Sequence, residues 1–253
     1  MMAVMTLDGT AVESIKELSH EKWMSLAQAE FDRMAELLRQ LEPGDWTRQT
    51  VCDLWDIRAM AGHVLGMAEA QASLPQFLHD FRSAKRIGGS VIDGINATQV
   101  KERSNLTAAQ IVDGLVLTAP RAVRTRRRTP ALMRSFIRMR QDPPFQSERW
   151  QYGYLVDAVF TRDTWIHRLD ICRATARAMV LTAEHDGRIV TDVVVDWARR
   201  HGRPFDLTLT GPAGGRYRRG ASGEAMELDA LDFCEILAGR RPGTGLLSTR
   251  VPF

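Results

Sequence analysis

Cysteine is scarce in this chain. The three cysteines, Cys52, Cys172 and Cys234, are scattered over 253 residues and form no CxxC pair. This spacing excludes a disulfide framework and fits a reducing compartment. Neither Cys52 nor Cys172 has a clear base nearby in the sequence, so we interpret both as buried small hydrophobic residues rather than nucleophiles.

Long hydrophobic runs are also missing. No segment reaches the roughly 18 uncharged apolar residues that a membrane helix needs. The first ten residues, MMAVMTLDGT, carry no basic leader ahead of an apolar stretch. We therefore predict a cytoplasmic protein with no membrane partner.

The chain has little excess charge of either sign. Its 34 basic and 31 acidic residues give a net charge of +3, which is not typical of a nucleic-acid binder. One local exception is residues 121–140, RAVRTRRRTPALMRSFIRMR, with eight arginines and no acid. This run is either a solvated helix face or an anion site for a carboxylate-bearing substrate or thiol cofactor. Nucleic acid is the weaker explanation, because no aromatic residues interleave with the arginines in the way that base stacking requires.

The composition that is present, 44% hydrophobic and 26% charged residues, fits a globular domain of about 170 residues plus a smaller one. Apolar residues at helical spacing predict four long helices before residue 180. These span about 13–41, 53–78, 107 into the arginine run and, after a break at 142–144, 150–178. The stretch 79–105 is ambiguous. We predict an N-terminal tail over 1–12 and a four-helix bundle over 13–180.

From Thr182 the pattern changes. A helix to His201 precedes a predicted strand over 205–210, a strand pair near 216–219 and 224–228, and a short helix over 230–238. These elements predict a small α+β domain over 181–253. The predicted fold class is therefore mainly α with a small α+β domain.

Polar residues interrupt the apolar seam of the last long helix. Asp163 and His167 are four residues apart, which places them one turn apart on the inward face. A buried carboxylate needs a cation, a hydrogen-bond network or water, and helix bundles often provide a metal ion held by facing helices. His63 lies between Met60 and Met67 on the inner side of the second helix, and it supplies a third candidate ligand.

Two imidazoles and one carboxylate leave a coordination position open, as in catalytic rather than structural zinc sites. Zinc is our first choice, although iron, nickel and manganese accept the same ligands. Alternatively, His63 is a satisfied core residue and Asp163 and His167 form only a helical ion pair. Asp170 is either an acceptor that orients an imidazole or a capping or surface carboxylate.

At these residues the chain resembles the mycothiol-dependent maleylpyruvate isomerase family, a branch of the DinB-like metal-binding four-helix bundles. The segment DTWIHRLDI carries part of the resemblance, and EAMELDALDFCEILAGR resembles the sterol-carrier-like small domain of this family. The remaining matches precede His63 and are Trp46, Thr50, Cys52, Trp55 and Arg58.

The resemblance implies an up-down bundle with a metal, typically zinc, held by His63, Asp163 and His167. The usual acid of the family is glutamate, so Asp163 is one methylene shorter. The ion is then expected closer to the last helix, bound through water, or bound more weakly.

The resemblance also implies a cofactor, mycothiol, which is a low-molecular-weight thiol of actinobacteria. Held as thiolate by the metal, its sulfur can add to an activated double bond for cis–trans isomerisation, or displace a leaving group in S-transfer. A C-terminal arginine is expected to steady the carboxylate of a small substrate. Arg240 is the best match and Arg216 or Arg218 are rivals, although Gly-Arg after a helix is also an ordinary C-terminal cap.

Two other functions stay open at this stage. One is a metal-dependent hydrolase or transferase that activates water, which thiol dependence would distinguish from the leading hypothesis. The other is a non-enzymatic binding protein in which the ion staples the bundle and the arginine run is a docking surface. In that case metal removal would unfold the protein.

Overall fold

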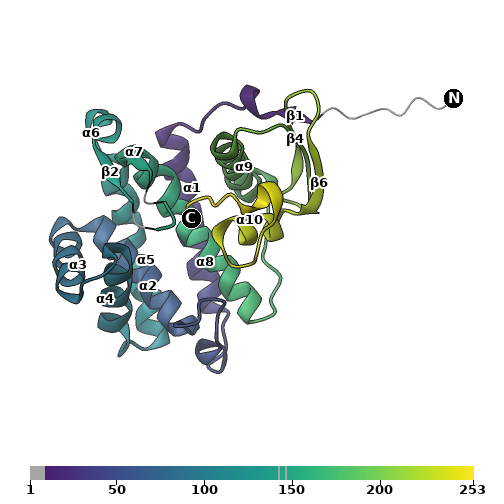
Figure 1. Cartoon of the computed structure of the whole chain (residues 1–253). Helices are drawn as coiled ribbons and strands as arrows, with labels where there is room; N and C mark the ends of the chain where they lie inside the picture. The colour runs from purple at the N-terminus through teal and green to yellow at the C-terminus, as the bar shows by residue number, and fades with distance from the viewer. Residues whose placement is uncertain (1–8, 142, 146) are drawn as a thin grey trace. The chain divides into compact units, whose positions relative to one another are not determined.

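The computed structural model describes residues 9–141, 143–145 and 147–253. Most of the predicted tail, residues 1–8, and the first residue of the predicted break at 142–144 lie outside the described residues. The chain divides into two compact units (Figure 1). We call them the helical unit, Ser19–Met179 with Phe253, and the α/β unit, residues 9–18 with Val180–Pro252.

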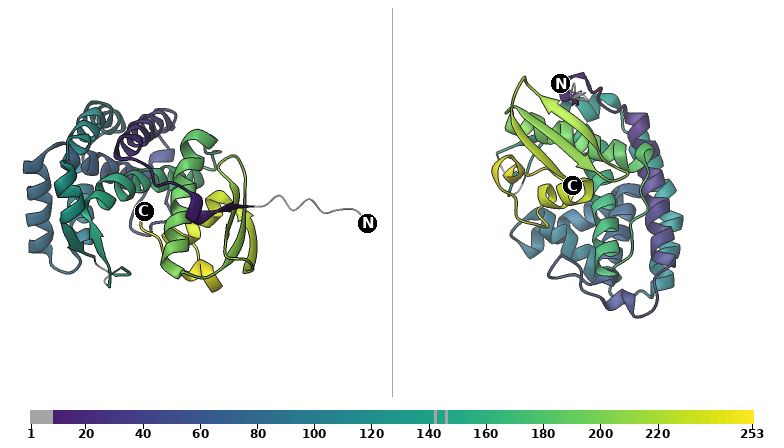
Figure 2. Two further views of the ribbon diagram at one scale, coloured as in Figure 1. Left: turned by 90° about the horizontal axis from the view of Figure 1, so that it is seen from above. Right: turned by 90° about the vertical axis from the view of Figure 1, so that its right-hand side faces the viewer.

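Four long helices form the core of the helical unit, as predicted. They are α1 (His20–Arg39), α2 (Ile57–Ala72), α5 (Ala108–Arg127) and α8 (Phe160–Ala174). Helix α5 packs against α1 and α2, and α8 also packs against both (Figure 2). Side-chain oxygens that accept backbone amides cap three of these helices at Ser19, Asp56 and Thr107. At the start of α5, Thr107 and Gln110 form a capping box.

The ambiguous stretch forms a helical hairpin, α3 (Leu74–Ile87) and α4 (Val91–Arg103). The second predicted helix therefore ends at Ala72 rather than 78, because Ser73 caps a new helix with proline in its first turn. Helix α4 packs closely on α2, where a Cβ on Gly66 would come within 2.7 Å of Gln99. Glycine is required at this crossing.

The arginine run extends beyond one helix. After α5 it continues through α6 (Ala131–Phe136) into β2 (Arg138–Arg140), which pairs antiparallel with β3 (Arg149–Gln151). The prediction of a helix from residue 150 is wrong at its start. Trp150 is buried in β3 and lies opposite half-buried Met139, with the neighbouring residues exposed, so an alternating strand pattern prevails there. The helix begins at α7 (Tyr152–Tyr154) and passes through a π-helical turn, Leu155–Val159, into α8.

The α/β unit contains a four-stranded sheet of order β1-β5-β4-β6. Its strands are β1 (Thr10–Ala11), β4 (Phe205–Thr210), β5 (Gly215–Arg219) and β6 (Glu224–Asp229). The predicted pairing of the last two strands with each other is wrong, because both flank β4, β5 antiparallel and β6 parallel. Strand β4 buries Phe205, Leu207 and Leu209, and this apolar face favours the central position.

Two helices complete the α/β unit. Helix α9 (Arg188–His201) follows a π-helical turn, Ala183–Gly187, and α10 (Ala230–Ala238) begins after the Asp229 cap. The predicted fold class, a helical bundle followed by a small unit of helices and strands, is confirmed. No helix within the described part of the chain combines the length and apolar character that crossing a bilayer requires.

The N-terminal boundary differs from the prediction. Thr10 and Ala11 pair in parallel with Tyr217 and Arg218 of β5, and Val12 is buried. Thr10 and Ala11 are therefore a strand of the sheet rather than part of a tail, and Val12–Ser14 form a 3-10 turn. Residues 13–18 group with the α/β unit rather than the bundle. An edge strand offers unpaired backbone groups, so a segment distant in sequence can complete it.

Candidate metal centre

Helices α2 and α8 bring the three predicted ligands together. His63, Asp163 and His167 each offer a donor atom, and these atoms lie within 4.8 Å of one another. His63 Nε2 is 3.7 Å from Asp163 Oδ2, and His167 Nε2 is 3.5 Å from Asp163 Oδ1. Residues 100 positions apart thus converge on one point. Their role as ligands remains a prediction.

These spacings suit a cation better than hydrogen bonds. Separations of 3.5 and 3.7 Å are at or beyond the limit of a hydrogen bond. Metal–ligand bonds of about 2.0–2.1 Å in a tetrahedral site place donor atoms roughly 3.3 Å apart. Asp163 Oδ2 and His63 Nδ1 are buried without a hydrogen-bond partner among the described residues. Unpaired buried polar atoms are costly, and a cation would satisfy the carboxylate.

Asp170 orients one imidazole, as one of the two sequence interpretations proposes. Its Oδ2 lies 3.1 Å from His167 Nδ1. When this carboxylate accepts the Nδ1–H, His167 Nε2 is left facing Asp163, which is the arrangement that metal-binding histidines use. Both residues are buried, so the ring is held firmly.

The charges in the cluster are strongly coupled. Burial lowers the pKa of His167, but Asp163 and Asp170 outweigh burial and raise it to about 9. Burial raises the pKa of Asp163, but His167 and His63 outweigh burial and hold it well below its usual range. The cluster therefore favours an ionised carboxylate and one positive charge. A divalent ion can replace that proton, since metal binding to histidine releases protons.

Trp55 forms an aromatic wall beside the cluster. Its ring centroid lies 4.9 Å from that of His63 and 5.9 Å from that of His167. The Thr50 hydroxyl donates to the Trp55 carbonyl at 2.7 Å, and the Gln49 amide donates to it at 3.0 Å. Sequence reasoning assigned Trp55 no role of its own. The feature of the sequence that could have identified Trp55 is its position in the connector just before α2, the helix that carries His63.

A buried ion pair anchors α8 next to the cluster. Arg168 Nε lies 2.5 Å from Glu30 Oε1, and Arg168 Nη2 lies 3.0 Å from Glu30 Oε2. Both side chains are almost fully buried, Glu30 in α1 and Arg168 in α8. This two-point pairing fixes α8 against α1 at the residue that follows His167.

The cysteines only partly match their predicted environments. All three are free. Cys172 is buried, and burial raises the pKa of its thiol, in keeping with a small hydrophobic residue. Cys52 is half-buried rather than buried, because the Thr50–Trp55 turn places it at the edge of the connector.

The arginine candidates lie in the α/β unit. Gly239 has a φ of +84°, and the Arg240 amide donates to the Glu235 carbonyl at 2.8 Å. The backbone at Arg240 therefore forms the helix cap that was one sequence interpretation. Whether its side chain binds a substrate remains a prediction. Arg218 Nε donates to the Gly9 carbonyl at 3.0 Å.

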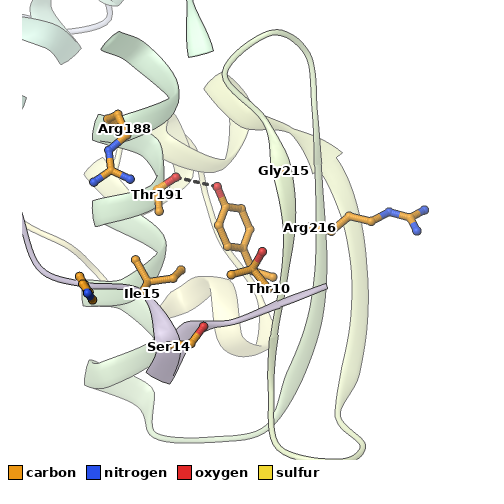
Figure 3. A pocket seen from close by; sticks show the side chains of 9 residues that line it. Thr10, Ser14, Ile15, Arg188, Thr191, Gly215 and Arg216 are labelled. Atoms are coloured by element: carbon orange, nitrogen blue, oxygen red, sulfur yellow. Dashed lines mark hydrogen bonds between the residues drawn. The ribbon is translucent and has the colours of Figure 1, made fainter. Parts of the chain in front are cut away.

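Arg216, the other rival, lines an open pocket of about 530 Å³ in the α/β unit. Tyr217 lines the same pocket, and its hydroxyl lies 2.8 Å from that of Thr191. Arg188 also lines the pocket, whereas the Arg216 side chain extends away from Arg188 and Thr191 (Figure 3). The pocket therefore draws its positive charge more from Arg188 than from Arg216.

Comparison with known proteins identifies the family of the chain. The family model described as mycothiol maleylpyruvate isomerase N-terminal domain matches residues 27–172, a range that contains His63, Asp163 and His167. No curated protein matches the chain. The chain is similar to a crystal structure of a mycothiol-dependent maleylpyruvate isomerase, with 16% sequence identity and a TM-score of 0.56. The match covers 92% of this chain and 92% of the other. The crystal structure of a mutant is 15% identical, with the same coverage and a TM-score of 0.55. These structures share the fold, and because the family model matches more than half of its residues, the chain belongs to the mycothiol maleylpyruvate isomerase family.

Proposed function

We propose that the protein is a metal-dependent enzyme that uses mycothiol. Its reaction is an isomerisation of the maleylpyruvate type or a thiol S-transfer, on a small electrophilic substrate that carries a carboxylate. The observation that carries this proposal is the convergence of His63, Asp163 and His167, with Asp163 Oδ2 buried and unpartnered. Membership of the family supports the choice of thiol.

His63, Asp163 and His167 are the residues that would hold the ion, with zinc as the first choice. When bound, a divalent cation favours the thiolate form of a sulfur ligand and so supplies a nucleophile near neutral pH. Three protein donors leave a position for that ligand. Asp170 keeps His167 Nε2 directed at the site, and the Asp163 side chain, 19% exposed, lies on the accessible side of the cluster.

The surrounding residues shield the imidazole side of the site from water. Trp55 covers the two imidazoles, and His63 is only 2% exposed. An apolar wall keeps water from the imidazole side and strengthens electrostatic interactions there. Arg240 is our proposed partner for the substrate carboxylate. We retain the predicted cytoplasmic location in this proposal, because the three cysteines are free and fit a reducing compartment.

The test is elemental analysis of the purified protein beside His63→Ala and His167→Ala. We expect near-stoichiometric metal in the parent and a loss of at least about tenfold in each variant, since each removes one of three ligands. His201→Ala, a histidine change in the α/β unit, is a control outside the donor set. Unchanged metal content in both histidine variants would refute the metal assignment.

Thiol dependence separates this function from a hydrolase that activates water. We expect turnover of maleylpyruvate or a related electrophile only when mycothiol is added, and a higher melting temperature with mycothiol than without it. Turnover at the same rate without thiol would instead favour the hydrolase.

Metal removal separates the enzyme from a metal-stapled binding protein. We expect a chelator to leave the helical unit folded, because its four long helices bury a large apolar core of their own. Loss of the helical circular dichroism signal on chelation would favour the stapled binding protein.

A further inference from the structure

One arginine of the basic run differs from the others because it is buried. Arg126 in α5 is 3% exposed, whereas Arg121, Arg124 and Arg128 are exposed. Burial lowers the pKa of Arg126 to about 10, which leaves the guanidinium charged at neutral pH. A buried charge without compensation is costly, so its partners must repay that cost.

Arg126 donates to four oxygens, of which two are backbone carbonyls of the π-helical turn Leu155–Val159 and one, at 3.4 Å, is the Gln71 side-chain oxygen of α2. Its Nε donates to the Val156 carbonyl at 2.8 Å, and its Nη2 reaches the Asp157 carbonyl at 3.3 Å. The same Nη2 donates to the Thr161 hydroxyl at 2.7 Å, and that hydroxyl donates to the Asp157 carbonyl at 2.8 Å. The guanidinium thus binds the turn itself rather than an acidic side chain among the described residues.

The π-helical turn changes the direction of everything that precedes α8. Here the Phe160 amide donates to the Leu155 carbonyl, five residues back, instead of four. One extra residue in a turn rotates the two flanking segments by about 100° relative to a continuous α-helix. Such turns are energetically less favourable than α-helix and need stabilising partners. Arg126 donates hydrogen bonds to two carbonyls within this turn, those of Val156 and Asp157.

A second set of contacts holds the same turn. The Asp157 side chain lies 2.7 Å from His20 Nδ1, at the start of α1, and 3.1 Å from Arg134 Nη1 in α6. The turn is therefore tied to α1, α5 and α6. Its C-terminal end leads directly into α8, where Thr161 precedes Asp163 by two residues.

We infer that Arg126 is a positioning residue for the candidate metal centre, because it holds the π-helical turn that sets the orientation of Asp163 and His167. The inference rests on the proposed function. Under this inference, Arg126 neither belongs to a solvated helix face nor binds an anion, which were the two interpretations of the basic run.

The test compares Arg126→Met, Arg126→Lys and Arg124→Met with the parent chain, using cobalt(II) as the probe. Methionine fills similar space but removes the guanidinium donors to the Val156 and Asp157 carbonyls. Arg124 is exposed in the same helix and serves as the matched control. We expect Arg126→Met to bind cobalt at least tenfold more weakly and to change the visible absorption of the bound ion. Arg126→Lys should restore part of the affinity, and Arg124→Met should behave like the parent.

A metal-free readout separates this inference from the proposed function. In Arg126→Met, we expect backbone amides of residues 155–161 to exchange with deuterium at least tenfold faster, while the helical circular dichroism stays at the parental level. A parent chain that binds no cobalt would refute the proposed function. A cobalt-binding parent together with an Arg126→Met variant of unchanged affinity and spectrum would overturn the inference alone.

If Arg126→Met fails to fold, Thr161→Val decides the matter. Valine has the shape of threonine but removes the hydroxyl that joins Arg126 to the Asp157 carbonyl. We expect weaker cobalt binding by severalfold and faster exchange in the same segment. Parental values for both Thr161→Val and Arg126→Lys would overturn the inference.

Discussion

The two units of the molecule bury charged and polar side chains to different extents. The helical unit buries charged and polar groups in its interior, among them Arg126, the Glu30–Arg168 pair and the His63–Asp163–His167 cluster. The α/β unit buries fewer such groups, His185, Asp186, Asp196 and Glu235, and the rest of its core is mostly apolar. Its centre is aromatic and aliphatic, and it includes Val193, Trp197, Phe205, Phe233 and Leu237.

This difference shows where function is concentrated. A stable core can be built from apolar residues alone, and buried charges cost free energy unless they are paired. A unit that nevertheless buries several charged groups uses them for geometry or chemistry. The three following changes test whether the helical unit depends on its buried charges while the α/β unit depends on packing.

The largest effect is expected from Glu30→Ala. This change removes the buried carboxylate that Arg168 contacts at two points, and breaking a buried ion pair costs about 3–5 kcal/mol of unfolding free energy. Urea denaturation followed by circular dichroism measures that loss. Glu36→Ala, an exposed position of the same helix, is the control and should change stability by less than about 0.5 kcal/mol. Similar losses in the two variants would contradict the distinction between buried and surface charge.

A smaller effect is expected from Trp197→Phe in the α/β unit. The indole Nε1 donates to the Leu246 carbonyl at 3.0 Å, and the ring contacts Phe205 and Phe233. Loss of the donor and of part of the ring volume should cost about 2 kcal/mol. We expect metal content to stay at the parental level, measured by elemental analysis. A parallel loss of metal would show that the metal centre depends on the α/β core.

The smallest effect is expected from the pH dependence of His201. Burial, with Arg219 and Arg203, lowers the pKa of His201 to about 4. The ring stays neutral when folded, with Nδ1 accepting the Arg203 amide at 3.1 Å. The unfolded chain takes up the proton below its ordinary pKa of about 6.5. The contribution of His201 to stability is therefore complete above pH 6.5 and is lost as the pH falls toward 4.

His201→Gln should remove this contribution. We expect a flatter dependence of the unfolding free energy on pH between 6.5 and 4 than in the parent, measured by urea denaturation at several pH values. Equal slopes in the two proteins would show that His201 does not titrate between the folded and unfolded states.

Local sequence patterns determined much of the fold. The strand Phe205–Thr210 and the helix Ala230–Ala238 match their predicted bounds, because alternation and capping act within a few residues. The candidate ligands His63, Asp163 and His167 were also accessible from sequence, since polar residues on apolar helix faces mark them. Asp170 followed from its spacing to His167.

Contacts between distant segments were decided only by the tertiary structure. Sequence spacing does not reveal that Arg126 binds the Val156 carbonyl, that Arg168 meets Glu30, or that β6 lies beside β4. The contact between Trp55 and His63 was likewise not predictable from sequence spacing. Propensity, capping and periodicity depend on neighbours in the chain, whereas these pairings depend on which buried charges and strand edges must be satisfied once the helices and strands pack together.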